Sequence, residues 1–164
     1  MAPAAGFVNL SALKSPPFRS YVVSLHLALN GFWAQRVIIG WLAWDITGSA
    51  GFVGLVAFLN FFPTLFVSPL FGVFADRIDV RKGSILSYAL AGILSALFAG
   101  LCIFGSPTPI LLALFSFVTG VISSANHPMR MSLTPRLAPA GDLPSVVAIT
   151  SLNFNMSRLI GPAI

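Results

Sequence analysis

Charged side chains are scarce in this sequence of 164 residues. Lys and Arg together number 9 and Asp and Glu 4, so charged residues make up 8% of the chain while hydrophobic residues make up 57%. A water-soluble domain carries about 25% charged residues, so this chain has too few to cover a surface that faces water. The scarcity excludes an ordinary soluble domain and favours a helical membrane protein.

Cysteine is nearly absent as well. The single residue, Cys102, excludes any disulfide within the chain. The basic residues are scattered and flank apolar segments, which fits a membrane protein better than a phosphate-binding face, so we expect no nucleic-acid partner. We also expect no metal site, no cofactor and no enzymatic activity.

Long apolar segments are what the sequence has in abundance. A helix needs about 20 residues to cross about 30 Å of hydrocarbon. We predict an all-α polytopic membrane protein with a leader over residues 1–20 and transmembrane helices over residues 21–164. Four spans and most of a fifth are predicted, over residues 21–43, 52–75, 83–105, 110–130 and from 143 to the end at 164. A turn is predicted at residues 45–49 and a linker at residues 131–144. In the third span Gly92, Ala96 and Gly100 recur at a spacing of four, which predicts a small-residue seam for close helix contact.

Polar residues recur inside the first and fifth predicted spans. Such groups are costly in hydrocarbon unless they face the protein interior or a water-filled cavity, so they are candidates for contacting a substrate or a coupling ion. Arg36 has an alternative role, because its long side chain could reach the outer interface instead. The candidates are Asn30, Gln35, Arg36, Asn153, Asn155 and Arg158 within spans, and Asp45, Asn126 and Arg130 near span ends.

The distribution of Lys and Arg predicts the orientation. The leader, the loop after the second span and the linker region carry cations, whereas the loops after the first and third spans carry none. Cytoplasmic loops are enriched in Lys and Arg, so we expect a cytoplasmic N-terminus and a multi-pass protein of the plasma membrane, such as the bacterial inner membrane, surrounded by the lipid bilayer.

One polar stretch, residues 72–82, separates the second and third spans. Five of the charged side chains fall within residues 76–82. Gly72 permits a close helix approach, and Asp76 can offer its carboxylate to the amides at a helix N-terminus. The cations Arg77, Arg81 and Lys82 can pair with acids or lipid phosphates. The alternative is an ordinary cytoplasmic loop.

This stretch resembles the signature between helices two and three of the major facilitator superfamily, Gly-x-Leu-Ala-Asp-Arg-x-Gly-Arg-Arg/Lys. Gly72, Ala75, Asp76 and Arg77 match it, while the basic pair Arg81-Lys82 comes one place late. The resemblance implies a transporter of small molecules that works by alternating access, with this turn latching its two halves on the cytoplasmic side. Members have twelve helices in two six-helix halves, so it also implies that the chain lacks a C-terminal half.

Two other stretches resemble the exporter branch that includes enterobactin and macrolide efflux proteins. They are Trp44 to Ser49, and Pro128-Met129-Arg130 with the following helix start at Leu143-Pro144. In the fifth span, Gly161-Pro162 is similar to the end of the antiporter signature, whose earlier glycines fall on Ala148 and Ser157. The resemblance implies efflux as a secondary active transporter, with protons as a candidate coupling ion. The proton-carrying acid would lie in the missing half, or Asp45 would serve.

Two other functions compete with transport. Asp76-x-x-Asp79 partly matches the metal-binding signature of membrane-embedded lipid-headgroup transferases, but these need further carboxylates on the next helix, and the only later acid is Asp142. A non-transporting membrane scaffold would leave the polar residues inside the spans unexplained. The downstream sequence discriminates these functions, because a second six-helix half would indicate a transporter.

Overall fold

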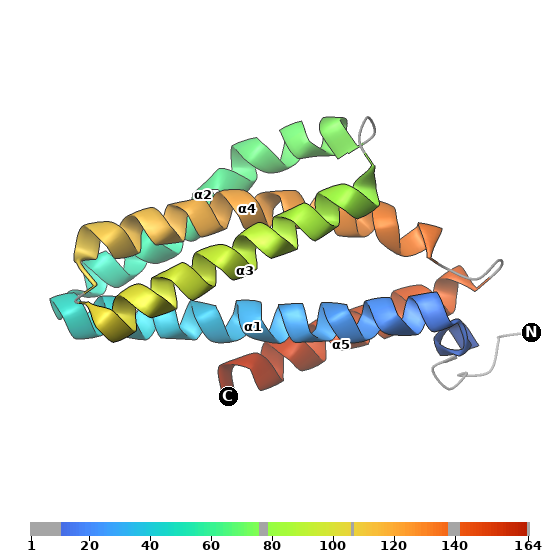
Figure 1. Cartoon of the computed structure of the whole chain (residues 1–164), viewed down its shortest axis with the longest axis horizontal. Helices are drawn as coiled ribbons and strands as arrows, with labels where there is room; N and C mark the ends of the chain where they lie inside the picture. Colours follow the sequence, from blue (N-terminus) through green and yellow to red (C-terminus); the bar gives the residue numbers. More distant parts are fainter. Residues whose placement is uncertain (1–10, 76–78, 106, 138–141, 164) are drawn as a thin grey trace, which may run out of the picture. The chain divides into compact units, whose positions relative to one another are not determined.

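The computed structural model describes residues 11–75, 79–105, 107–137 and 142–163, with all their side chains except those of residues 71–75 and His127. These ranges are almost entirely helical and contain no strand (Figure 1). The helices are η1 (Ser11–Lys14), α1 (Pro16–Thr47), α2 (Ala50–Ala75), α3 (Val80–Phe104), α4 (Pro109–Arg136), α5 (Leu143–Ile160) and η2 (Gly161–Ala163). The predicted all-α fold is confirmed.

Four of these helices are long and apolar enough to cross a membrane. They are α1, α2 over Ala50–Leu70, α3 and α4. Helix α5 is shorter, with 18 residues, and its second half is more polar because it holds Asn153, Asn155 and Arg158. The prediction of a polytopic helical membrane protein is therefore confirmed.

Helix α1 is longer at both ends than the predicted span. It begins at Pro16, inside the predicted leader, because proline fits the first turn of a helix, where its missing N–H is not needed. It continues to Thr47, through most of the predicted turn. Gly48 then ends it with a φ of 58°, and the N–H of Gly48 donates to Trp44 O at 2.7 Å. A left-handed residue of this kind is a common helix end.

Two predicted boundaries near the end of the chain are wrong. The linker predicted over residues 131–144 is helical over residues 131–136, which extend α4. The fifth span begins at Leu143 as predicted, but it ends at Ile160 instead of continuing to residue 164. Gly161 and Pro162 explain the end, because glycine is a poor helix former and proline removes a helical hydrogen bond.

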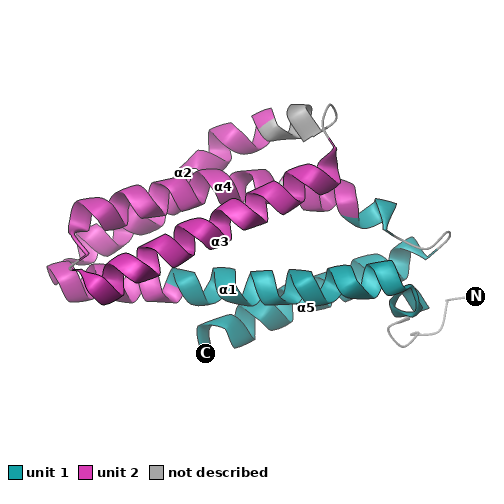
Figure 2. Cartoon of the chain, viewed as in Figure 1, with its two compact units in different colours: residues 1–36, 134–164 teal, residues 37–133 magenta. Residues whose placement is uncertain are grey.

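The chain divides into two compact units, which Figure 2 colours separately. Unit 1 comprises Met1–Arg36 and Thr134–Ile164. Its core joins η1, the first part of α1 and α5 through the buried side chains of Ala12, Phe18, Val146 and Ile149. The Tyr21 hydroxyl lies 3.0 Å from Thr134 Oγ1 and adds a polar contact to this core. The first part of α1 and α5 are therefore packed partners.

Unit 2, Val37–Leu133, holds the last part of α1 together with α2, α3 and most of α4. Its main core contains Ile39, Ala43, Val56, Leu112 and Phe115. The ring of Phe115 stacks on that of Phe98 from α3, with centroids 4.0 Å apart. A second core of Val80, Ala125 and Met129 joins the start of α3 to α4.

Close helix contact in unit 2 occurs at Gly120 of α4. A β-carbon there would lie 2.4 Å from Asn60 O of α2, so only glycine permits this approach. The sequence instead suggested a small-residue seam at Gly92, Ala96 and Gly100 of α3, but a β-carbon at either glycine would meet no atom within 4 Å. Small residues matter here because helices in lipid associate through packing and hydrogen bonds rather than the hydrophobic effect.

Candidate functional site

Four polar side chains meet between α1 and α5 in unit 1, and we call them the α1–α5 polar cluster: His26, Asn30, Asn153 and Ser157. His26 Nδ1 lies 2.6 Å from Asn153 Oδ1 and 3.1 Å from Ser157 Oγ. Asn30 Nδ2 donates to Ser157 Oγ at 3.4 Å and to His26 O at 2.8 Å. Asn153 and Ser157 are buried, with 7% and 0% of their surface exposed. The cluster is therefore a hydrogen-bonded polar interior between two apolar helices.

Asn30 and Asn153 were predicted as candidates from the sequence and Ser157 only as part of the antiporter-like motif, whereas His26 was not predicted. A signal was present in the spacing. His26 and Asn30 are four residues apart, and so are Asn153 and Ser157, so each pair lies on one face of its helix. Two polar pairs at this spacing, each inside an apolar helix, indicate that the two faces contact each other.

Trp33 continues the same face of α1 beyond the cluster. Its ring meets Phe154 of α5 edge to face, with centroids 5.9 Å apart. Two guanidinium groups lie over it: the Cζ of Arg36 at 5.4 Å and the Cζ of Arg158 at 5.6 Å from the ring centroid. Cations at such distances are attracted to the face of an indole. Arg36 and Arg158, predicted separately from two spans, are thus brought to one aromatic side chain.

Two buried polar atoms in this region have no hydrogen-bond partner among the described residues. They are the donor Trp33 Nε1 and the acceptor Asn30 Oδ1. Buried polar groups are nearly always paired, because an unpaired one costs about 1–3 kcal/mol. An unpaired acceptor at Asn30 and an unpaired donor at Trp33, whose ring lies under two guanidinium groups, can bind a polar molecule.

The antiporter-like motif residues lie along and just beyond α5. Ser157 belongs to the α1–α5 polar cluster, and Gly161 is buried against α1. A β-carbon at Gly161 would lie 2.7 Å from Trp33 Cβ, so a larger residue cannot occupy this position without moving one helix. Ala148 is half-buried, and Pro162 is exposed in η2. The small residues at positions 157 and 161 therefore allow α5 and α1 to approach.

Three other candidates from the first and fifth spans lie outside the cluster. Gln35 is half-buried in α1. Asn155 is exposed, and its amide donates to Ser151 O of its own helix at 2.9 Å. Asp45 is exposed near the end of α1. The structure thus separates Asn155 from Asn153, although the two are only two residues apart, because they lie on different faces of α5.

The predicted gating turn is only partly described. Asp76 and Arg77 lie outside the described residues. Gly72 lies in the last part of α2, where only the backbone is described. Arg81 and Lys82 are exposed in the first turn of α3. Asp79, which was not predicted to cap a helix, is the N-cap of α3. Its Oδ1 accepts from the N–H groups of Arg81 at 2.9 Å and Lys82 at 3.3 Å.

A second set of polar contacts lies within unit 2. The predicted candidate Asn126 accepts a hydrogen bond from Ser87 of α3, and Arg130 is half-buried one turn further along α4. Between α2 and α4, Asn60 Nδ2 donates to Ser116 O at 3.3 Å and Ser124 Oγ donates to Thr64 Oγ1 at 3.2 Å. These contacts join helices in pairs. They are explained by helix packing in lipid, where polar groups must find partners.

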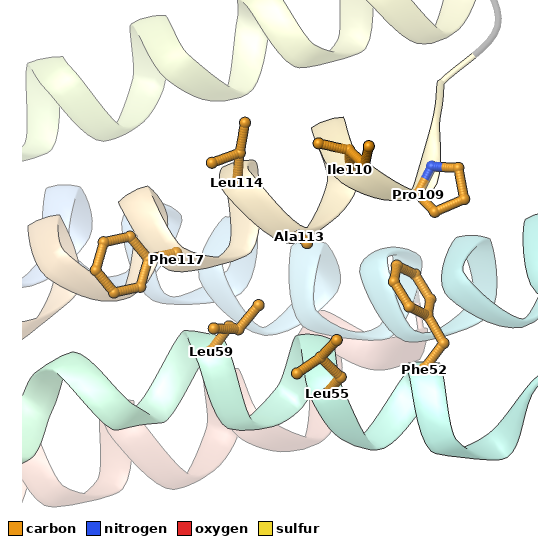
Figure 3. A pocket seen from close by; sticks show the side chains of 8 residues that line it. All are labelled: Phe52, Leu55, Leu59, Pro109, Ile110, Ala113, Leu114 and Phe117. Carbon is orange, nitrogen blue, oxygen red and sulfur yellow. The ribbon is translucent and has the colours of Figure 1, made fainter.

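A groove lies between α2 and α4 in unit 2 (Figure 3). Only hydrophobic side chains line it: Phe52, Leu55, Leu59, Pro109, Ile110, Ala113, Leu114 and Phe117. It offers no side chain that can form a hydrogen bond, so it cannot orient a polar substrate. Among the described residues, no group of three His, Cys, Asp or Glu side chains could hold a metal ion.

Apolar helices of membrane-spanning length, with a polar cluster enclosed between two helices, define a multi-pass helical membrane protein. The chain belongs to the transmembrane secretion effector family of the major facilitator superfamily, because the model of that family matches residues 8–164. The resemblance to this superfamily predicted from residues 72–82 is therefore confirmed.

One relative has a described function. The staphyloferrin A transporter of Staphylococcus aureus (strain NCTC 8325 / PS 47) is 26% identical over 144 residues, which are 86% of this chain and 36% of that protein. The chain thus spans about a third of the length of this curated relative. No solved structure matches the chain.

Proposed function

We propose that the chain is the N-terminal part of a secondary active transporter that exports a small molecule by alternating access. The α1–α5 polar cluster is the observation that supports this most directly. Four hydrogen-bonding side chains inside membrane helices are costly to place there, and transporters commonly use such groups to handle substrates and ions. Membership in the transmembrane secretion effector family supports export as the direction.

The region around Trp33 is the proposed substrate contact. Arg36 and Arg158 supply two positive charges there, and guanidinium groups bind carboxylate or phosphate oxygens strongly. Trp33 Nε1 can donate a hydrogen bond to the substrate and Asn30 Oδ1 can accept one. We therefore propose a substrate that carries an anionic group together with a hydroxyl or amine donor.

The remaining parts of the proposal concern the complete transporter. We propose a plasma-membrane protein with a cytoplasmic N-terminus, completed by a C-terminal half. Asp76 and its neighbouring cations would close the cytoplasmic side, and Ser157, Gly161 and Pro162 would form part of an antiporter-type helix contact. The relative's name makes staphyloferrin A the first molecule to test. The antiporter-like motif at Gly161-Pro162 makes protons the first coupling ion to test.

The test uses inverted membrane vesicles from cells that express the complete transporter. Because the cytoplasmic face of such vesicles points outward, an exporter accumulates its substrate inside them. We expect accumulation of staphyloferrin A when the interior is made acidic. The variant R158Q should raise the concentration needed for half-maximal uptake about tenfold or more, because a hydrogen bond to a charged group contributes about 1.5–3 kcal/mol.

The matched control is R136Q, which removes an exposed cation at the end of α4 that belongs to neither the cluster nor the Trp33 region. It should leave uptake unchanged. If vesicles with the unaltered transporter do not accumulate staphyloferrin A, this substrate is wrong. If they do and R158Q behaves like R136Q, the assignment of Arg158 is wrong.

A further inference from the structure

We propose that His26 is a proton-binding site of this protein and that the proton is taken up at Nε2. The position of the proton follows from the α1–α5 polar cluster alone. The use of that site in transport rests on the proposed function. Histidine is the side chain best suited to gain and lose a proton near neutral pH, and His26 is placed inside a helix of membrane-spanning length.

The hydrogen bonds fix which nitrogen of His26 carries the proton in its neutral form. Asn153 Nδ2 donates to the backbone oxygen of Val22 at 3.3 Å, so the amide must turn its Oδ1 toward the imidazole. The reverse orientation would place two oxygens against each other. Because an amide oxygen only accepts hydrogen bonds, His26 Nδ1, 2.6 Å away, must be the donor.

Nε2 is therefore the nitrogen with a free lone pair. Proton uptake at Nε2 converts the imidazole to an imidazolium and breaks no hydrogen bond, because Nδ1–H still donates to Asn153 Oδ1. Ser157 Oγ, 3.1 Å from Nδ1, is a second oxygen beside the ring. Hydrogen bonds from a charged donor are shorter and stronger than neutral ones, so the hydrogen bond to Asn153 Oδ1 persists in the charged form.

His26 is the only titratable side chain among the four residues of the α1–α5 polar cluster, and the charged residues of unit 1 lie outside it. Arg158 is the only ionisable residue of α5, and its guanidinium lies over Trp33 together with that of Arg36. Asp142, just before α5, is the only acidic residue of unit 1. It accepts a hydrogen bond from the Ser11 hydroxyl of η1. Its position is 11 residues before Asn153, roughly 16 Å along the helix at about 1.5 Å per residue.

The other cations of unit 1 lie outside the cluster, and Arg19, seven residues before His26 in α1, is the nearest of them in sequence. Lys14 is in η1, Arg19 is in the first turn of α1, and Arg136 ends α4. No carboxylate lies between Pro16 and Arg36 in α1 or within α5. A proton-carrying acid, expected from the sequence at Asp45 or in the missing half, is thus not required on these helices, because His26 can take that role.

The first test measures the proton directly and needs no substrate. The chain contains two histidines, so the variant H127Q leaves His26 as the only imidazole. Nitrogen NMR of ¹⁵N-histidine in lipid nanodiscs should show protonated Nδ1 and unprotonated Nε2 in the neutral form. Acidification should protonate Nε2 while Nδ1 keeps its proton. Protonated Nε2 in the neutral form, or no protonation of Nε2 on acidification, would overturn the proposal. If H127Q does not fold, the unaltered chain is measured and His26 is assigned by the signal that H26N removes.

The second test asks whether the proton moves with the substrate. In H26N, the side-chain amide nitrogen takes the place of Nδ1 and keeps the donor to Asn153, but it cannot accept a proton. We expect liposomes with the complete H26N transporter to move staphyloferrin A down its gradient, while the accompanying proton flux falls to that of empty liposomes. Unchanged proton flux in H26N would overturn the role of His26 in coupling.

The two tests separate the two proposals. If the unaltered transporter does not move staphyloferrin A, the proposed substrate fails, and the NMR measurement alone decides whether His26 binds a proton at Nε2. If the substrate is moved and the NMR result is negative, the transport function stands and the proton site is wrong.

Discussion

Gly161 and Trp33 are in direct contact at the place where the end of α5 crosses α1. A β-carbon at residue 161 would lie 2.7 Å from Trp33 Cβ and 2.9 Å from Asn30 O. The second of these atoms belongs to the backbone, which cannot turn away as a side chain can. The contact therefore fixes how closely α5 can approach the helix that carries His26 and Asn30.

The substitution Gly161→Ala should weaken the packing of α5 on α1. Inserting a methyl group into a filled contact costs about 1–3 kcal/mol. We expect the free energy of unfolding, measured in mixed micelles with increasing denaturing detergent, to fall by that amount. Gly100→Ala is the control, because a β-carbon there would meet nothing within 4 Å, and it should leave stability unchanged or slightly raised. Equal effects of the two substitutions would contradict the contact.

Asn153→Ala removes the acceptor of His26 Nδ1 and the donor to Val22 O. Hydrogen bonds between membrane helices contribute about 0.6 kcal/mol on average, and an unpaired buried group adds its own cost, so we expect a loss of about 1–2 kcal/mol in the free energy of unfolding. The control Asn155→Ala removes an exposed amide that bonds only to its own helix, and it should change stability by less than about 0.5 kcal/mol. A stability loss that is the same for both would mean that the cluster does not join α1 to α5.

The sequence predicts which segments are helices far better than it predicts which helices touch. Runs of apolar residues are sufficient to locate α1 to α4, and Lys, Arg and proline mark most of their ends. The helices are apolar on nearly all sides, however, so periodicity does not distinguish a face that meets lipid from one that meets another helix. Gly92 and Gly100 were predicted to pack closely against another helix, whereas the glycines that do so are Gly120 and Gly161.

Part of the candidate site was predictable residue by residue, but His26, Trp33 and the arrangement of the site were not. The cost of polar groups in lipid selects Asn30, Arg36, Asn153 and Arg158 from the sequence. It does not indicate that the guanidinium groups of both arginines lie over the Trp33 ring, because that depends on the crossing of α1 and α5. Asn155 was selected by the same argument as Asn153, and only the rotation of α5 separates the exposed residue from the buried one.

Asp79→Ala should shorten or loosen the start of α3. The carboxylate satisfies two of the amides that a helix leaves free at its first turn, and replacing such a cap by alanine costs about 1 kcal/mol. We expect the free energy of unfolding to fall by about that amount, with faster amide hydrogen exchange at Arg81 and Lys82. Asp79→Asn retains an acceptor oxygen and should lose much less. Identical exchange in the two variants would show that the cap contributes nothing measurable.

Asp76→Asn should slow transport by the complete protein without lowering the stability of this chain, in contrast to Asp79→Ala. If Asp76 interacts with a helix end in the other half of the transporter, as its position in the superfamily signature suggests, the loss of its charge weakens the closed cytoplasmic side by about 1 kcal/mol. That energy corresponds to a shift of roughly fivefold toward the conformation that is open to the cytoplasm. The rate of transport by the complete protein should fall, while substrate affinity measured from the cytoplasmic side stays nearly constant.

The 164-residue chain should unfold as before, because the partner of Asp76 in this proposal is not part of it. A loss of stability in the chain as large as that of Asp79→Ala would mean that Asp76 supports the local structure of the turn, and the gating role would then be wrong.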